Sequence, residues 1–185
     1  MHPRQLIRLI TAVLAVYFIY MGTLGAPGNH SSGTTSSGGP ALYPVAKVVD
    51  GDTIEVLKDS ERVTVRLIGI NTPETVDPRR PVQCFGKEAS VEAHRVLAGQ
   101  SVSLETDPSQ DTYDKYGRLL AYTFLPDGSL FNEHMIAAGF AHEYTYDQPY
   151  KYQKQFKEAE QAARFAGRGL WALSTCAGDT TQAAQ

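Results

Sequence analysis

Apolar and polar residues alternate over several short stretches after residue 42, the pattern of β-strands with one buried face. The first two stretches flank Asp50-Gly51, a dipeptide typical of hairpin turns. The third places Val63, Val65 and Leu67 on one face. The five predicted strands cover residues 45–49, 53–57, 62–70, 101–105 and 119–125. Five short strands of this kind indicate a small barrel.

Apolar residues at helical spacing predict three helices, at residues 87–98, 131–138 and 152–166. Each stretch is followed by a glycine (Gly99, Gly139 or Gly167), the residue most common just beyond a helix C-terminus. The sequence therefore predicts an α+β domain with a five-stranded barrel and three helices.

The N-terminus is expected to be a targeting segment outside the fold. Residues 9–24 form an uncharged, mostly apolar run that is long for a signal peptide and short for a membrane span. Residues 1–26 are therefore a signal peptide or a retained membrane anchor, and both alternatives place the domain outside the cytoplasm. Residues 27–40 form a Gly/Ser-rich linker. The folded domain is expected at residues 41–177 and a disordered tail at 178–185.

The charge balance argues against a protein that binds nucleic acid through bulk positive charge. The 185 residues include 17 Lys and Arg and 20 Asp and Glu, which gives a formal net charge of −3. Arg4 and Arg8 are the only charged residues before Ala41, so the folded part is more acidic than the whole chain. Binding through bulk charge needs many neutralised phosphates, so any contact with a polyanion must be local.

The chain has two cysteines, Cys84 and Cys176, and no Cys-x-x-Cys sequence. Structural metal sites need more ligands at close spacing. In an exported chain an even number of cysteines favours a disulfide over free thiols, and Cys84–Cys176 is the only pairing available. Two free thiols remain the alternative.

Three turn-like segments carry the candidate chemistry. They are DGDT at residues 50–53, NTPE at 71–74 and DKYGR at 114–118. Pro73 in the second segment favours an extended backbone at Thr72. Each segment taken alone is typical of an ordinary turn. Only the three segments together can indicate a function.

In this order and at these separations, the three segments resemble the signature of the staphylococcal nuclease (thermonuclease) family. That signature has an Asp-Gly-Asp-Thr turn, a strand end with Asp-Thr-Pro-Glu-Thr, and an Asp-Lys-Tyr-Gly-Arg hairpin. The resemblance covers about residues 41–171 and includes FGKEAS at 85–90 and GFA at 139–141. It implies an OB-type five-stranded β-barrel with three helices that hydrolyses phosphodiesters of DNA and RNA with Ca²⁺.

The resemblance also implies a metal site. Asp52 would bind Ca²⁺ through its carboxylate and Thr72 through its backbone carbonyl, both hard oxygen donors. Asp50 would hold metal-bound water. Asn71 stands where the family has a metal-binding aspartate, so the site would keep an oxygen donor and lose one negative charge. The alternative is that Asn71 only caps the turn, with Ca²⁺ bound elsewhere or absent.

The catalytic roles follow from the same resemblance. Glu74 would orient or deprotonate the attacking water, and Arg66 and Arg118 would bracket the phosphate. Guanidinium groups suit this task because their planar forks match phosphate oxygens in pairs.

Substrate contacts are also implied by the resemblance. Lys115 and Tyr116 would contact a neighbouring phosphate or sugar. Tyr144 or Tyr146 would stack on a base, as aromatic side chains do in proteins that bind single strands. Arg79-Arg80 matches a basic loop of the family that would guide substrate locally.

The expected function is hydrolysis of DNA and RNA by an exported, monomeric, Ca²⁺-dependent nuclease, tethered to the membrane if the N-terminal segment is retained. The main alternative is a non-catalytic nucleic-acid-binding module on the same barrel. Such a module would not need Arg66, Glu74 and Arg118, and all three are present. A scaffold without a nucleic-acid role would leave this set of residues unexplained.

Overall fold

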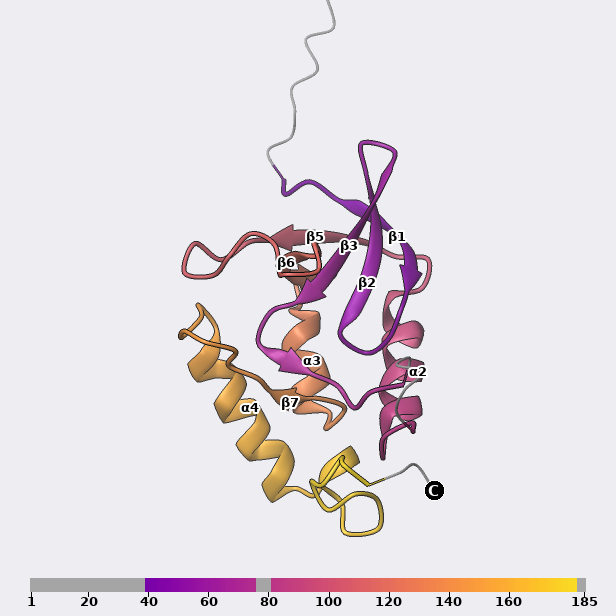
Figure 1. The fold of residues 1–185 in the computed structure, drawn as a ribbon, viewed down its shortest axis with the longest axis vertical. Coiled ribbons are helices and arrows are strands. Elements are labelled where there is room, and N and C mark those ends of the chain that lie inside the picture. The colour runs from indigo at the N-terminus through magenta and orange to yellow at the C-terminus, as the bar shows by residue number, and fades with distance from the viewer. Residues whose placement is uncertain (1–38, 76–80, 183–185) are drawn as a thin grey trace, which may run out of the picture. The chain divides into compact units, whose positions relative to one another are not determined.

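The computed structural model describes residues 39–75 and 81–182 (Figure 1). Residues 1–38, with the predicted targeting segment and nearly all of the linker, lie outside the described residues. Residues from Pro40 onward form one compact unit. Within the described ranges, no helix combines the length and apolar character that a membrane span requires.

Five strands close into a barrel in the order β1-β2-β3-β6-β5, which confirms the predicted architecture. Neighbouring strands are antiparallel except β3 and β6, which pair in parallel. The barrel strands are β1 (Tyr43–Val48), β2 (Thr53–Lys58), β3 (Glu61–Leu67), β5 (Ser101–Glu105) and β6 (Leu119–Phe124). Outside the barrel, β4 (Ile70–Asn71) pairs with β7 (His142–Glu143) in a two-stranded sheet that the sequence pattern did not predict.

The third strand ends earlier than the alternation of residues 62–70 predicts. It stops at Leu67, and the chain turns at Gly69, whose φ is +79°. A Cβ at Gly69 would lie 2.6 Å from the ring of Tyr150, so a side chain does not fit here. The turn separates β4 from β3 and so sets the direction of the segment that begins at Asn71.

The connection between β1 and β2 covers residues 49–52, one residue more than the predicted strands leave between them. The backbone N–H groups of Val49 and Asp50 both donate to the carbonyl of Thr53, at 2.9 and 3.2 Å. Gly51 has no positive φ, which the type I′ hairpin turn typical of Asp-Gly would require at this position. The connection is therefore a loop that carries two carboxylates, Asp50 and Asp52, at one end of the barrel.

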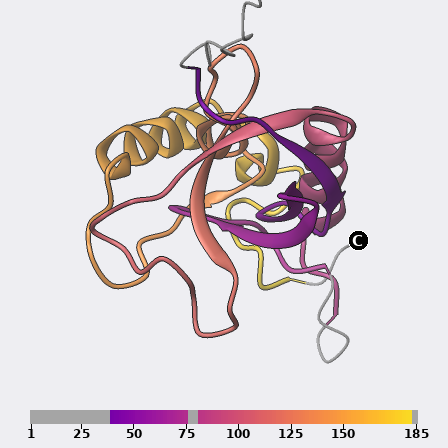
Figure 2. The same cartoon turned by 90° about the horizontal axis from the view of Figure 1, so that it is seen from above.

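The three predicted helices are present within two residues of their expected bounds. They are α2 (Gly86–Leu97), α3 (Phe131–Ala137) and α4 (Gln153–Phe165), and a short 3₁₀ turn, η1 (Gly169–Trp171), follows. In Figure 1 the helices lie below the barrel, with α2 and α4 on opposite sides and α3 between them. Figure 2, seen from above, again separates α2 from α4.

A buried asparagine links the barrel to α3. Asn132 has no exposed surface; its Oδ1 accepts from Thr123 N and its Nδ2 donates to Ile68 O, both at 2.9 Å. Ile68 belongs to the turn between β3 and β4. Because buried polar groups are costly unless hydrogen-bonded, these two bonds fix the turn relative to β6 and α3.

Cys84 and Cys176 form a disulfide in the structure, across 92 residues of sequence. Both are buried and pack with Leu170 beside the main core. Two residues of the predicted tail, Gly178 and Gln182, hydrogen-bond to this cluster. Gly178 N donates to Leu170 O, and Cys84 N donates to Gln182 O.

Replacing both cysteines (Cys84→Ala with Cys176→Ala) should lower the free energy of unfolding by up to ~4 kcal/mol. The disulfide closes a long loop and so restricts the unfolded chain. Urea denaturation of the oxidised wild type and of the variant measures the difference. An unchanged free energy of unfolding would show that the bond adds nothing to stability.

Candidate active site

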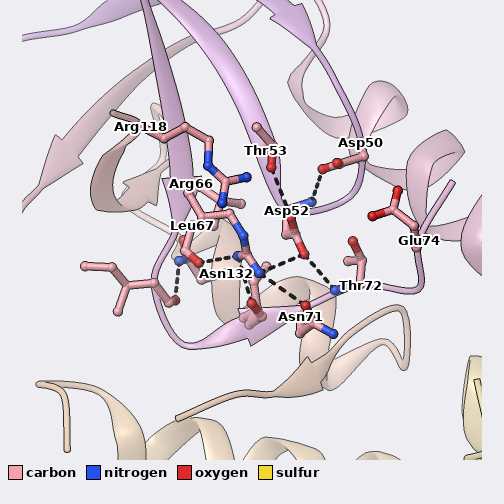
Figure 3. A network of polar contacts seen from close by, with 12 residues as sticks. Asp50, Asp52, Thr53, Arg66, Leu67, Asn71, Thr72, Glu74, Arg118 and Asn132 are labelled. Atoms are coloured by element: carbon pink, nitrogen blue, oxygen red, sulfur yellow. Dashed lines mark hydrogen bonds and ion pairs between the residues drawn. The ribbon is translucent and has the colours of Figure 1, made fainter. Parts of the chain in front are cut away.

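The predicted site residues come together where the β1–β2 loop meets the end of β3 and the segment that starts at β4 (Figure 3). The loop supplies Asp50 and Asp52, and β3 supplies Arg66. The segment from β4 supplies Asn71, Thr72 and Glu74. These three stretches become one cluster because the turn after β3 brings the β4 segment back beside the loop.

Asp52 is the residue that connects these elements. It is only 6% exposed, and its Oδ2 accepts from Thr72 N at 2.8 Å. The same oxygen lies 3.1 Å from Nη2 of Arg66. Its Oδ1 accepts from the hydroxyl of Thr53 at 3.1 Å. A single carboxylate therefore ties the β1–β2 loop to β3 and to the extended segment at Thr72.

Arg66 fixes the turn that follows its own strand. Its Nη1 donates to the carbonyls of Leu67 and Ile70, at 2.8 and 2.9 Å. Its Nη2 donates to Oδ1 of Asn71 at 3.3 Å. The Asn71 amide oxygen and the Asp52 carboxylate therefore lie against the same guanidinium group.

Asp50 is held against Asp52. Oδ1 of Asp50 accepts from the backbone N–H of Asp52 at 3.0 Å. Burial and the neighbouring Asp52 carboxylate raise the pKa of Asp50 above its ordinary value. A cation at this point would favour the charged form of Asp50.

Glu74 lies on the other side of the cluster, and its carboxylate points toward Asp52 in Figure 3. One of its oxygens accepts from Thr75 N at 2.8 Å. Its own backbone N–H donates to Oε1 of Gln83 at 2.7 Å. Gln83 was not singled out in the sequence, because nothing in a lone glutamine indicates which backbone group it will reach.

Arg118 is brought to the cluster by strand register. Arg66 on β3 is paired with Leu120 on β6, and Arg118 lies two residues before Leu120. Side chains two residues apart share a face of a sheet, so Arg66 and Arg118 face away from the buried Val65 and Leu67. In Figure 3 the guanidinium group of Arg118 points toward Arg66.

Asp114 orients Arg118 within its hairpin. Oδ2 of Asp114 accepts from Nε of Arg118 at 2.6 Å, and Oδ1 accepts from its backbone N–H at 2.9 Å. Burial alone would raise the pKa of Asp114, but these hydrogen bonds lower it overall. Among the described residues, the two terminal nitrogens of Arg118 have no hydrogen-bond partner. They remain available to a phosphate.

Three exposed tyrosines, Tyr116, Tyr144 and Tyr146, lie on segments next to those that carry the cluster. Tyr116 is 72% exposed and lies under Lys115 and Arg118 in cation–π contacts. Tyr144 and Tyr146 form a pair with ring centroids 6.4 Å apart, and Tyr144 N donates to Gly69 O. The pair therefore follows directly on β7, the partner of the strand that carries Asn71. Arg79 and Arg80, the predicted guiding residues, lie outside the described residues.

The available donors for a metal ion are all oxygen atoms. Where the structure is described, three or more Asp, Glu, His and Cys side chains do not gather as a metal-binding group. The cluster instead combines the carboxylates of Asp50 and Asp52 with the amide oxygen of Asn71, and the backbone of Thr72 lies beside them. A mixed set of this kind suits Ca²⁺, which takes carboxylate, amide and backbone oxygens.

The family comparisons agree with this geometry. Residues 64–173 match the family model described as staphylococcal nuclease homologue. The chain is 39% identical to thermonuclease from Staphylococcus hyicus over 163 residues, which is 88% of this chain and 95% of that one. The chain belongs to the staphylococcal nuclease family.

Other members give the same result. Thermonuclease from Staphylococcus intermedius is 38% identical over 88% of this chain and 94% of its own length. Endonuclease YncB from Bacillus subtilis is 37% identical over 69% of this chain and 60% of its own length. Membership of the staphylococcal nuclease family supports hydrolysis of nucleic acids as the activity of this chain.

Gly51→Ala should lower the nuclease activity at least about tenfold while the domain stays folded. A Cβ at Gly51 would lie 2.6 Å from Cγ2 of Thr72, so the added methyl group must push the loop and the Thr72 segment apart. Misplacement of this size at an active site can cost as much as ~100-fold in rate. The matched control is Gly39→Ala, whose Cβ would meet nothing within 4 Å. Equal activity of both variants would show that the close approach is not required.

Proposed function

We propose that this chain is an exported, monomeric, Ca²⁺-dependent nuclease that hydrolyses phosphodiesters of DNA and RNA. The observation that carries the proposal is the Asp52 carboxylate, bonded to Thr72 N and paired with Arg66. It holds Arg66 and the Thr72 segment together, and Glu74, two residues after Thr72, points its carboxylate toward Asp52 (Figure 3). Arg118, on the same face as Arg66, supplies a second guanidinium group.

Ca²⁺ would be held by the Asp52 carboxylate, the Asn71 amide oxygen and the Thr72 carbonyl. Asp50 would reach it through water. The half-buried Asp50 carboxylate lies beside the buried Asp52 carboxylate, and desolvation together with this neighbour raises the pKa of Asp50, so a divalent cation would stabilise the charged form of Asp50. When bound, Ca²⁺ supplies positive charge that offsets the growing negative charge of the phosphate.

The other steps of hydrolysis are assigned to three side chains, Glu74, Arg118 and Arg66. Glu74 orients the attacking water and accepts its proton. Arg118 binds the phosphate oxygens through its two terminal nitrogens, because Asp114 already occupies its Nε. Arg66 would contact the phosphate through its Nε, because its two terminal nitrogens already hold Asp52, Asn71 and two backbone carbonyls. Charge stabilisation by such fixed groups is the largest contribution in many enzymes.

Substrate recognition is expected to be local. Lys115 and Tyr116 contact a neighbouring phosphate or sugar, and Tyr144 or Tyr146 stacks on a base. Stacking is available to any base that is not already stacked in a duplex, so single strands are the preferred form. Arg79 and Arg80 guide the substrate, which allows an acidic domain to engage a polyanion.

The N-terminal residues 1–26 export the domain, either as a cleaved signal peptide or as an anchor that tethers it to the outer face of the membrane. The disulfide between Cys84 and Cys176 supports this location, because disulfides persist in oxidising compartments.

Glu74→Gln and Arg118→Lys should each reduce hydrolysis at least ~100-fold and leave the protein folded. The first removes the proton acceptor, and the second replaces a planar fork by a point charge. The assay is degradation of single-stranded DNA with Ca²⁺, with a chelator-treated sample and circular dichroism as controls. Turnover close to wild type in either variant would show that the substituted residue is not part of the mechanism. Full activity in the chelator-treated sample would show that hydrolysis does not require the metal.

Asn71→Asp should tighten Ca²⁺ binding measured by calorimetry, because it restores a negative charge to the donor set. Asp52→Ala should abolish binding. Unchanged affinity in Asn71→Asp would show that this side chain is not a ligand and would favour its role as a turn residue.

A further inference from the structure

Gln83 and Glu74 are joined by two hydrogen bonds, one donated by each residue. Gln83 N donates to Glu74 O at 2.9 Å, and Glu74 N donates to Oε1 of Gln83 at 2.7 Å. Both backbone polar groups of Glu74 are thus fixed by one residue nine positions later in the chain. The glutamine side chain acts directly on the peptide group from which the Glu74 side chain extends.

The turn that begins at Gln83 also packs tightly against the Glu74 segment. Gly86 N donates to Gln83 O at 3.0 Å and closes the turn. A Cβ at Gly86 would lie 2.7 Å from Cγ2 of Thr75 and 3.2 Å from Glu74 O. The two backbones therefore touch, and movement of the turn would be passed on to Glu74.

The disulfide fixes this turn from the other side. Cys84, next to Gln83, is bonded to Cys176 and packs with Leu170, Phe85 and Trp171. The ring of Phe85 stacks on Phe140, with centroids 5.6 Å apart. Phe85 has a φ of +67°, which a residue with a side chain adopts only when its surroundings enforce it. The turn is thus constrained by a covalent bond and by packing.

We propose that Gln83 is a positioning residue for Glu74, and that the Cys84–Cys176 disulfide holds Gln83 in place, so that full nuclease activity requires the oxidised chain. The inference rests on the role of Glu74 in the proposed function.

The redox step is a thiol–disulfide exchange with a dithiol reductant. The Sγ–Sγ bond breaks, the two cysteine sulfurs gain two electrons and two protons in total, and the reductant becomes a disulfide. Cytosolic thiol systems keep such cysteines reduced, whereas the exterior lets the bond form. The newly made chain would therefore be less active before export than after it.

Gln83→Leu and Gln83→Glu test the positioning role. Leucine fills a similar volume without an acceptor, and glutamate keeps an oxygen for Glu74 N. We expect kcat of Gln83→Leu to fall at least about tenfold with KM within about twofold, because Glu74 is misplaced and the substrate contacts are not. Gln83→Glu should recover most of kcat. Gln155→Leu is the control, since Gln155 is a glutamine on α4 that bonds only to Glu133 among the described residues. Wild-type kcat in Gln83→Leu, or equal losses in both Gln83 variants, would overturn the proposal.

Reduction of the disulfide tests whether activity depends on the Cys84–Cys176 bond. Dithiothreitol should lower kcat of the wild type at least about tenfold, the scale expected for a misplaced catalytic group. Alkylation and mass spectrometry verify complete reduction. The variant Cys84→Ala with Cys176→Ala should have the lower kcat with or without reductant. Unchanged kcat in the fully reduced wild type would refute the dependence. Loss of the circular dichroism signal together with kcat would refute positioning as its cause.

The Glu74→Gln variant distinguishes failure of this inference from failure of the proposed function. If Glu74→Gln is active, the role of Glu74 is wrong. If Glu74→Gln is inactive and Gln83→Leu is normal, only the positioning inference is wrong.

Discussion

The buried Asp52 carboxylate is the interaction on which the rest of the site depends. It accepts a backbone N–H from Thr72, twenty residues later, and pairs with Arg66 on the strand between them. A carboxylate so little exposed is stable only when its charge is compensated by hydrogen bonds and an opposite charge. The same requirement brings the β1–β2 loop, β3 and the Thr72 segment to one point, where oxygen donors and arginine meet.

The barrel provides the remaining geometry through its strand register. Because β3 and β6 pair in parallel, Arg66 and Arg118 reach the same outer face although 52 positions separate them in the sequence. The inward face of these strands is apolar and buried, so a shift of one residue would exchange arginine for core side chains. Packing of the core thereby protects the alignment of the two guanidinium groups.

The acidic charge of the chain is compatible with a polyanionic substrate because the site needs only a few cationic side chains, and these are held in fixed orientations. Asp114 binds one edge of Arg118 and leaves the other edge free among the described residues. On the opposite side, the turn at Gln83 and the disulfide restrain the backbone of Glu74. Asp114 and Gln83 thus orient Arg118 and Glu74 without adding positive charge to the site.

The sequence by itself determined the element types and the barrel, and it named the candidate residues that the structure brings together, because alternation, helical spacing and three local motifs depend on neighbouring residues only. It placed Asp52, Arg66, Glu74 and Arg118 among the candidates and favoured the disulfide. It missed the β4–β7 pair, extended β3 past Leu67 and gave no sign of Gln83 or of the hydrogen bonds that Gly178 and Gln182 make. Those features rest on contacts between distant segments: Gly69 turns because Tyr150 packs on it, and Gln83 matters because Glu74 N lies within its reach. Only the tertiary structure decides them, since no local preference records which backbone group a distant side chain will meet.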